Sequence, residues 1–304
     1  MIRLGYASQN LTIGASTGHT LRLANLSDVP KVKGVVQENL SALERIVTWN
    51  AESGIGLFRM SPQFIPLASH PDFPYDWQLE HGPELERVGD LAWKNKIRLS
   101  VHPGQYIHPA SLNPDVVQRS LDELRYNAKL LSCLGSRDGV IVLHLGGSFG
   151  DKTETIARFV EALRREREIL RYLALENDER VWTVAQVWQA ADALGVPVIV
   201  DTLHHELNPG AFTLQTALEL ALPTWPGRPK LHISTQDPDK QRGAHAWGIA
   251  PQDWRSLTTA LAGRPVDVMV EAKGKDQAVL ALLSAPHERR AFPSDAVQLL
   301  HGAA

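Results

Sequence analysis

Six residues that can bind a metal ion stand at the ends of apolar runs with the length and β-branched content of buried strands. They are three histidines, two glutamates and one aspartate: His102, His144, Glu176, Asp201, His232 and Glu271. Imidazole and carboxylate ligands without a thiolate suit Zn²⁺, Mn²⁺, Fe²⁺ or Co²⁺ and disfavour a soft-metal site. The pattern therefore predicts a metal site to which several strands contribute.

The loops that follow these runs add His70, His204 and His245, which raises the number of candidate ligands to nine. A catalytic ion with four ligands needs only three from the protein, so nine ligands indicate a cluster of two or three ions. A strand-end histidine on its own is more often a hydrogen-bonded residue. Carboxylates and imidazoles gathered without cations would be costly to desolvate, which favours the metal cluster. Glu176 could bridge two of the ions.

The elements that position these residues alternate between strands and helices. Strands are expected at Ile2–Tyr6, Ile55–Met60, Ile97–His102, Val140–Leu145, Tyr172–Glu176, Val196–Asp201, Lys230–Ser234 and Val266–Glu271. Helices are expected at Val35–Ala51, Glu84–Lys94, Asp115–Leu134, Lys152–Arg165, Val184–Leu194, Thr213–Leu222 and Pro251–Leu261. Eight such units in roughly 250 residues predict an α/β fold of the (β/α)₈ TIM-barrel type, whose active sites lie at the carboxyl ends of the strands.

The chain has no linker rich in glycine, serine or proline and no short repeat. We therefore expect a single TIM-barrel domain over residues 1–283 and a C-terminal tail over residues 284–304. The longest irregular segments are expected at Leu11–Val32 and Pro62–Pro83. Long loops after strands usually carry binding surfaces.

The alternation of side chains along a strand predicts which residues face the barrel interior. In the run that ends at His102, the apolar neighbours would face the helices, which leaves Ser100 and His102 pointing inward. Lys230 stands two residues before His232 and should point inward as well. A buried lysine there could form an ion pair with one of the site carboxylates, or it could be carboxylated near the metals. The sequence leaves both alternatives open.

Composition adds only general limits. The 304 residues are 43% hydrophobic and 21% charged with a net charge of −3, so global charge makes no case for nucleic acid binding. The single cysteine, Cys133, cannot form an internal disulfide and is expected to pack in the core. No apolar stretch approaches the ~20 residues of a membrane span, and the N-terminus lacks the zones of a signal peptide, so we expect a cytoplasmic protein. Four histidines are expected at the surface: His19, His81, His287 and His301.

The chain resembles the UV damage endonucleases of the bacterial type, which are related in fold and site to endonuclease IV. Seven blocks carry the resemblance in order from about residue 1 to residue 275. They are Arg3–Tyr6, Ala68–Pro71, Ser100–Tyr106, Leu143–Gly147, Leu175–Glu179, Val200–His205 and Val270–Lys275. Seven matched blocks make a specific signal, whereas one such block alone would be weak.

The resemblance implies a metal-dependent nuclease that nicks damaged double-stranded DNA directly 5′ to a pyrimidine dimer or 6-4 photoproduct. It implies a 3′-hydroxyl and a 5′-phosphate as products and three ions held by the nine ligands above. Manganese is the leading candidate, with zinc, cobalt or magnesium as alternatives. The family's lysine at the position of Lys230 is carboxylated. In endonuclease IV an aspartate two residues before the histidine matching His245 helps to hold the third ion, whereas Gly243 stands here.

Roles for the site residues follow from phosphodiester chemistry. Two ions can lower the pKa of a bridging water and clamp the attacking and leaving oxygens. We expect Glu176 and Asp201 to bridge and orient, with His102 and His144 on one ion and His232 and Glu271 on another. Glu271 could also help to deprotonate the water. The catalytic set is completed by Lys230.

Lesion recognition requires an unstacked duplex, which is less costly to open at damaged sites. The pair Gln105-Tyr106 resembles the residues with which the UV damage endonucleases probe the duplex where the damaged dinucleotide is flipped out. With Tyr6 and Asn10 it forms the expected lesion-binding set. Three cations near the strand ends could contact phosphates: Arg59, Lys273 and Lys275.

Two rival functions share many of these features. A sugar isomerase of the same barrel class also uses carboxylates and histidines on divalent ions. A lesion-binding protein with purely structural metals would bind damaged DNA without cutting it. The sequence indicates no obligate protein partner, and we expect a monomer.

Overall fold

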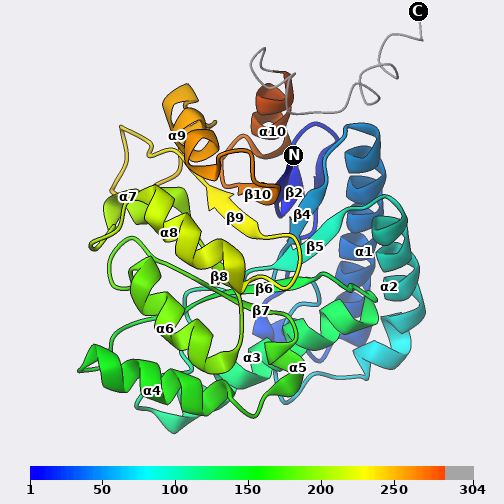
Figure 1. Ribbon diagram of the computed structural model, residues 1–304. Helices are drawn as coiled ribbons and strands as arrows, with labels where there is room; N and C mark the ends of the chain where they lie inside the picture. The colour runs from blue at the N-terminus through cyan, green and yellow to red at the C-terminus, as the bar shows by residue number, and fades with distance from the viewer. Residues whose placement is uncertain (285–304) are drawn as a thin grey trace, which may run out of the picture.

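The computed structural model describes residues 1–284, and within them a sheet of eight parallel strands forms the centre of the molecule (Figure 1). The strands are β1 (Ile2–Ala7), β4 (Leu57–Met60), β5 (Arg98–Val101), β6 (Val140–His144), β7 (Leu173–Glu176), β8 (Val198–Ile199), β9 (Lys230–Ile233) and β10 (Val266–Val270). A separate antiparallel hairpin pairs β2 (Gln9–Asn10) with β3 (Ala15–Ser16). Each expected strand is confirmed, with ends that shift by up to two residues.

The sheet closes into a barrel at the seam between β8 and β9. Ladder hydrogen bonds order the strands β8-β7-β6-β5-β4-β1-β10-β9. Across the open edge, the backbone N–H of His232 donates to the carbonyl of Val200 at 3.0 Å, and Asp201 and His232 form a parallel bridge. The (β/α)₈ architecture predicted from the strand and helix alternation is therefore confirmed. Its closure depends on two residues that are also candidate metal ligands.

Helices cover the outside of the barrel (Figure 1). They are α1 (Val29–Glu52), α2 (Trp77–Lys94), α3 (Pro114–Cys133), α4 (Lys152–Leu163), α5 (Arg167–Leu170), α6 (Val184–Leu194), α7 (Thr202–Leu207), α8 (Leu214–Ala221), α9 (Pro251–Leu261) and α10 (Lys275–Ser284), with 3-10 turns η1 (Leu23–Asn25) and η2 (Leu222–Thr224). Side-chain caps explain several of the starts. Asp151 accepts the backbone N–H groups of Thr153 and Glu154, and Thr183 forms a capping box with Gln186.

Helix α2 begins earlier than the sequence pattern predicts. The proline at position 83 indicates an irregular segment that ends there, yet the helix starts at Trp77 and contains Pro83. Asp76 caps it by accepting the backbone N–H groups of Gln78 and Leu79. A proline in the second turn removes one intrahelical hydrogen bond, and here the cap and the buried face of α2 outweigh that loss. The segments expected to be irregular are thus shorter than predicted, and β3, η1 and the start of α1 also lie in the first of them.

A polar network fills the amino-terminal end of the barrel. Asp267 is fully buried and accepts hydrogen bonds from Arg3 Nε at 2.7 Å, Arg98 Nη1 at 3.0 Å and Arg228 Nε at 2.7 Å. Further up the barrel, Lys230 Nζ donates to Ser100 Oγ at 3.0 Å. The inward direction predicted for the last two residues is confirmed. The metal-ligand types occupy the opposite, carboxyl end of the strands.

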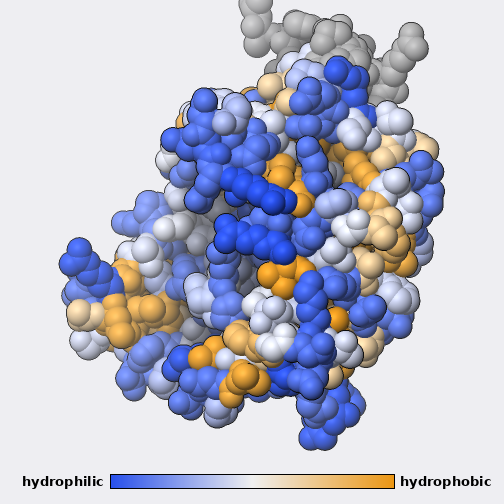
Figure 2. All heavy atoms as spheres, turned by 90° about the vertical axis from the view of Figure 1, so that its left-hand side faces the viewer, coloured by the Kyte–Doolittle hydropathy of each residue, from blue (hydrophilic) through white to orange (hydrophobic). Residues whose placement is uncertain are grey.

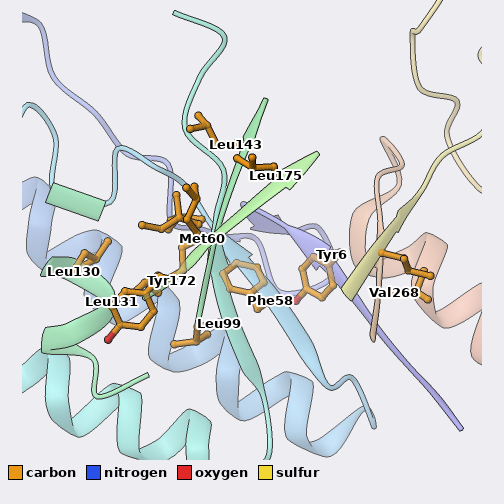
Figure 3. Close-up of a cluster of buried hydrophobic side chains, with 14 of the residues drawn as sticks. Tyr6, Phe58, Met60, Leu99, Leu130, Leu131, Leu143, Tyr172, Leu175 and Val268 are labelled. Carbon is orange, nitrogen blue, oxygen red and sulfur yellow. The ribbon is translucent and has the colours of Figure 1, made fainter. Parts of the chain in front are cut away.

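The main apolar core lies between the outer face of the sheet and the helices. Figure 3 shows Tyr6 and Phe58 side by side within it, with ring centroids 5.4 Å apart in an edge-to-face arrangement. Burial of each such side chain contributes about 1.5–3 kcal/mol. This rigid packing holds the strand ends in place beneath the site.

The positions of His81, His19 and Cys133 bear on expectations from the sequence. His81 is buried and lies 3.0 Å from the Tyr75 hydroxyl, so its expected surface position is wrong, whereas His19 is exposed as expected. Cys133 is half-buried against the core. The expected tail, apart from its first residue at the end of α10, and the two histidines within it lie outside the described residues. Within residues 1–284, no helix has the length and apolar character of a membrane span.

Candidate metal centre

Six strand-end side chains converge at the mouth of the barrel as two groups with a common member. His102, His144 and Glu176 form the first group, and Glu176, Asp201, His232 and Glu271 form the second. In each group, one potential ligand atom from every residue lies within 4.8 Å of the others. The strands β5, β6, β7, β9 and β10 carry or immediately precede five of these residues, and Asp201 lies two residues after β8, as the barrel geometry requires.

Glu176 stands at the centre of both groups. Its Oε2 lies 3.0 Å from His102 Nε2 and 3.4 Å from His144 Nε2. Its Oε1 lies 2.6 Å from His232 Nδ1, which is also 2.9 Å from Oε1 of Glu271. The two oxygens of one carboxylate therefore face different sets of ligands, which is the geometry of a group that bridges two ions.

Unpartnered polar atoms show that this cluster suits metal ions. Glu176 Oε2, Asp201 Oδ2 and His232 Nε2 are buried and have no hydrogen-bond partner among the described residues. Buried acceptors of this kind are costly to leave unsatisfied. His102 Nε2 lies 3.0 Å from Glu176 Oε2, but the contact lacks hydrogen-bond geometry and leaves Oε2 without a partner. Divalent cations would satisfy all three atoms at once.

The electrostatics of the cluster keep its carboxylates ionised. Burial raises the pKa of Glu176, but the nearby rings of His232 and His144 outweigh it and hold that pKa well below 4.5. Burial likewise raises the pKa of Glu271, and Arg59 and His232 bring it well below its usual range. Burial lowers the pKa of His102 to about 4. Anionic carboxylates and a neutral imidazole are the forms that bind metal ions.

His204 and His245 stand beside the two groups. His204 Nδ1 lies 3.9 Å from Asp201 Oδ1, and the His204 ring centroid is 5.6 Å from that of His144. Burial lowers the pKa of His204, but Asp201 and the other carboxylates outweigh it and raise that pKa to about 9. His245 Nδ1 lies 3.8 Å from Glu271 Oε2. Eight of the nine candidate ligands thus lie around one mouth.

His70 is the ninth candidate, and its ion-pair contact within residues 1–284 lies outside the two ligand groups. Its carboxylate neighbour among the described residues is Asp72, at 3.8 Å. The ring lines a cavity of about 1210 Å³ together with Tyr106 and His108. The structure therefore associates His70 with the cavity beside the mouth, and its role as a ligand stays a prediction.

Asn177 is a positioning residue that the sequence reasoning missed. Its backbone carbonyl lies 3.1 Å from His204 Nδ1, its Oδ1 accepts the backbone N–H of Asp201 at 2.9 Å, and its Nδ2 donates to the Asp201 carbonyl. Outer partners of this kind orient metal ligands. Its place directly after Glu176 was the available signal.

Lys230 is fully buried below the cluster. Burial, with the charges of Arg59 and Arg98, holds the pKa of its amine well below 10.5. Among the described residues no carboxylate lies within ion-pair distance of it, so the ion-pair alternative is wrong for this structure. Nζ donates to Ser100 Oγ instead, because the acidic groups lie above it and are already paired with histidines.

The three cations expected to meet phosphates differ in their surroundings. Arg59 forms an ion pair with Glu271 inside the mouth. Lys273 is exposed and pairs with Asp237 at 2.7 Å. Lys275 is partly buried, and burial with the charge of Arg59 lowers the pKa of its amine. Of the three cations, Arg59 is therefore the one that pairs with a carboxylate of the metal centre, Glu271.

The expected lesion-binding residues separate into an exposed and a buried pair. Gln105 and Tyr106 are exposed, and Tyr106 is 59% accessible. Tyr6 and Asn10 are buried in this structure, and their expected contact with DNA stays a prediction. The Tyr6 hydroxyl donates to Asn50 Oδ1 and accepts from Asn10 Nδ2, both at 2.7 Å, which makes these residues part of the core beneath the hairpin.

A second network that the sequence reasoning missed supports Tyr106. Gln63 Nε2 donates to the Tyr106 hydroxyl at 3.2 Å and to Glu123 Oε1 at 3.1 Å, and Ser69 Oγ donates to the other Glu123 oxygen at 2.6 Å. Burial raises the pKa of Glu123. The network ties the loop of Gln105 and Tyr106 to the wall of the large cavity, whose lining includes Arg119, Arg125 and Lys129. Ser69 lies in the matched block Ala68–Pro71, but no sequence motif marks Gln63 or Glu123.

One face of the molecule is largely polar. Figure 2 shows that the face on the left of Figure 1, over α4 to α9, is largely hydrophilic and is hollowed near its middle. Apolar side chains appear on this face as separate orange groups among the hydrophilic ones.

Comparisons with known proteins agree with this geometry. The chain is 31% identical over 294 residues to the UV DNA damage endonuclease of Clostridium perfringens, covering 94% of this chain and 71% of that protein. It is 33% identical over 298 residues to a putative UV-damage endonuclease of Acanthamoeba polyphaga mimivirus, covering 93% and 90%. The crystal structure of SacUVDE matches with a TM-score of 0.91 at 35% identity over 96% of this chain and all of that one.

More distant structures share the fold alone. Endonuclease IV from Thermus thermophilus matches with a TM-score of 0.58 at 13% identity over 82% of this chain and 95% of that one. A D-psicose 3-epimerase from Clostridium cellulolyticum matches with a TM-score of 0.54 at 17% identity over 83% and 88%. The family described as UV-endonuclease UvdE matches residues 2–294, nearly the whole chain. This protein belongs to the UV-endonuclease UvdE family.

Proposed function

We propose that this protein is a metal-dependent endonuclease that nicks double-stranded DNA immediately 5′ to UV lesions and leaves a 3′-hydroxyl and a 5′-phosphate. Its membership of the UvdE family supports the nuclease activity. The observation that carries the proposal is the pair of ligand groups joined by Glu176, whose unpartnered atoms suit divalent ions.

The residues divide into two well-formed ligand sets and a third, looser one. His102, His144 and Glu176 would hold one ion, and Asp201, His232 and Glu271 would join Glu176 around a second. His204 and His245 would contribute to a third. Bound ions of this kind, with manganese the first choice and zinc, cobalt or magnesium as alternatives, activate water and stabilise the charge of phosphodiester hydrolysis.

The protein groups around the ions have separate tasks. Glu271 is ionised and contacts the His232 ring and the Arg59 guanidinium. It can therefore orient the attacking water and accept part of its proton. Arg59 stands beside it and can exchange part of that ion pair for a phosphate oxygen. Asn177 fixes the orientation of the His204 ring and the Asp201 backbone.

The substrate is recognised through an opened duplex. Tyr106 projects from the loop after β5 and can stack on unpaired bases, while Gln105 can hydrogen-bond a base edge. The basic side chains that line the large cavity can meet the backbone of a strand that leaves the mouth. Opening costs a few kcal/mol and less at a damaged step, which supports lesion selectivity.

For Lys230 we propose the carboxylated form. The amine is buried, lacks a carboxylate partner and has a lowered pKa, so its lone pair is available. The nitrogen adds to the carbon of CO₂ and releases one proton, and the product is an anionic carbamate near the metals. The native mass of the protein should exceed the sequence mass by one CO₂, and Lys230→Met should remove the increment.

The decisive experiment incubates the purified protein and Mn²⁺ with a labelled duplex that contains a single pyrimidine dimer. An undamaged duplex serves as the control, and extension by a DNA polymerase reports a free 3′-hydroxyl. We expect a nick directly 5′ to the lesion. Binding without a nick at any metal tested would favour the structural-metal alternative, and turnover of a free ketose instead would favour an isomerase.

We also infer that the protein acts as a monomer in the cytoplasm, without an obligate protein partner, because the proposed substrate is genomic DNA of the cell. Light scattering coupled to gel filtration tests the first point. Cell fractionation tests the second.

A further inference from the structure

A glutamate outside the nine candidate ligands faces the looser end of the metal centre. Glu179 Oε2 lies 3.9 Å from His204 Nε2. This distance is too long for a hydrogen bond. It is shorter than the sum of two metal–ligand distances of about 2.0–2.2 Å, so one ion can touch both atoms.

His204 directs that nitrogen toward Glu179 because its other nitrogen is occupied. Nδ1 lies 3.1 Å from the Asn177 backbone carbonyl, which fixes the ring. The His204 side chain is only 13% accessible and that of Glu179 is 21% accessible, so both are held at the edge of the mouth. A histidine with one nitrogen bound to a carbonyl and the other free is typical of a metal ligand.

The backbone around Glu179 is also fixed. Asp178 accepts the backbone N–H groups of Arg180, Val181 and Trp182, and its own N–H donates to the Trp182 carbonyl. These bonds close a tight turn after β7. The turn holds the Glu179 side chain on the same side of the barrel as His204.

Gly243 leaves the space that Glu179 occupies. A Cβ atom at Gly243 would lie 3.2 Å from Glu179 Cγ and 3.7 Å from its Oε1. The backbone N–H of Gly243 donates to Gln236 Oε1 at 2.7 Å, and Gln236 and His245 form an antiparallel bridge, so the loop cannot easily move away. Any larger side chain at this position would crowd the carboxylate.

We propose that Glu179 is the carboxylate ligand of the ion at His204, and that Gly243 is the residue that makes room for it. His245, two residues after Gly243 on the same loop, would be the second histidine ligand of this ion. The inference rests on the proposed multi-metal nuclease site and adds a ligand to it. A carboxylate from the loop after β7 thus takes the place that a side chain at position 243 would otherwise fill.

The competing explanation is a surface ion pair. Arg180 Nε lies 3.2 Å from Glu179 Oε1, and the Arg180 side chain is 72% accessible. An exposed pair of adjacent residues contributes little to stability. The two explanations predict different effects of Arg180 on metal affinity. If Glu179 binds an ion, the Arg180 guanidinium competes with that ion for the carboxylate. If Glu179 forms only a surface ion pair, Arg180 does not affect metal affinity.

The test counts metal ions on the full-length protein. Metal-free wild type is titrated with Mn²⁺ alone, and calorimetry with elemental analysis gives the number of ions and their affinities. Glu179→Gln should weaken one ion by at least tenfold and leave the others unchanged, since even outer partners of ligands affect affinity by about 10–100-fold. Arg180→Ala should tighten the same ion by up to about fivefold.

A matched control and a rescue complete the design. Glu166 is 20% accessible and pairs with Arg125, so Glu166→Gln removes a glutamate of equal exposure from a site without metal ligands and should change no affinity. In the double variant Glu179→Ala with Gly243→Asp, the carboxylate returns from the opposite loop and should recover the lost ion. The positive φ of Gly243, +85°, is one that aspartate tolerates better than most residues.

The outcomes separate this inference from the proposed function. Equal ion counts and affinities for wild type and Glu179→Gln would overturn the inference, even if both proteins cut beside the lesion. Loss of one ion from Glu179→Gln would support it, even if the wild type cut no DNA. Circular dichroism of each variant verifies that it is folded.

Discussion

Nδ1 of His232 lies 2.6 Å from Oε1 of Glu176, although 56 residues separate them along the chain. The two residues stand on β9 and at the end of β7, which are not hydrogen-bonded neighbours in the sheet. Only the curvature of a closed barrel brings their side chains together across its interior. The metal centre therefore depends on barrel closure as much as on the ligands themselves.

Glu176→Ala should remove metal from both ligand groups, because each group contains this residue. We expect the loss of two ions per chain and a fall in cleavage rate of about 10³-fold or more, as for loss of a principal electrostatic group. Elemental analysis and a nicking assay measure the two effects. Glu219→Ala, on the exposed side of α8, should change neither. Full metal content in Glu176→Ala would rule out the bridging role.

Tyr106→Ala should weaken binding to a duplex with a lesion by about 10–100-fold, because base stacking on an aromatic ring contributes about 1–3 kcal/mol. Binding to undamaged duplex should change little, and metal content should not change. Tyr106→Phe loses only the contact with Gln63 and should retain most of the affinity. Fluorescence anisotropy on both duplexes measures the difference.

An exposed aromatic residue far from the site provides the control. Trp93 lies on α2, is 46% accessible and stacks on Arg137. Trp93→Ala should leave both affinities unchanged. If Trp93→Ala and Tyr106→Ala had equal effects, the contact of Tyr106 with the opened duplex would be refuted.

Asp267→Asn should destabilise the barrel from its amino-terminal end. The change removes a fully buried anion from three guanidinium partners and leaves their charges uncompensated. Breaking a buried ion pair in this way costs about 3–5 kcal/mol. Urea unfolding measures the loss, and metal content at low temperature should remain normal.

A surface pair gives the comparison for this prediction. Glu44 accepts two hydrogen bonds from Arg87 between exposed side chains. Glu44→Gln should reduce the free energy of unfolding by no more than about 1 kcal/mol. Similar losses in the two variants would show that the buried network contributes no more than a surface pair.

Stability should fall below pH 6.5 in part because of His81. Burial lowers the pKa of this ring from 6.5, with a smaller opposing effect of Glu80 and Glu84. The unfolded chain therefore binds more protons at this position than the folded chain just below pH 6.5. The contribution of His81 to the free energy of unfolding therefore rises with pH across that window. The same contribution is lost as the pH falls.

His81→Gln keeps a partner for the Tyr75 hydroxyl and removes the titration. The difference in Tm between about pH 7.5 and about pH 5.5 should be smaller in this variant than in the metal-loaded wild type. His19→Gln changes an exposed ring and should leave the difference as it is. An unchanged difference in His81→Gln would contradict the assignment.

The sequence by itself determined the barrel and the strand-end ligand types. Buried parallel strands need continuous apolar residues, so the eight runs are visible in the sequence, and strand polarity places their last residues at one mouth. Side-chain alternation was enough to put Ser100 and Lys230 inside. These properties depend on local periodicity, which a sequence displays directly.

Only the tertiary structure decided which side chains reach the mouth from other elements. Tyr6 and His81 carry polar groups that were expected to be accessible, but both are buried, and these groups contact Asn50 and Tyr75 instead. Glu179 faces His204 only because Gly243, on another loop, has no side chain. Contacts of this kind depend on how loops pack across the barrel end, and no local pattern encodes that packing.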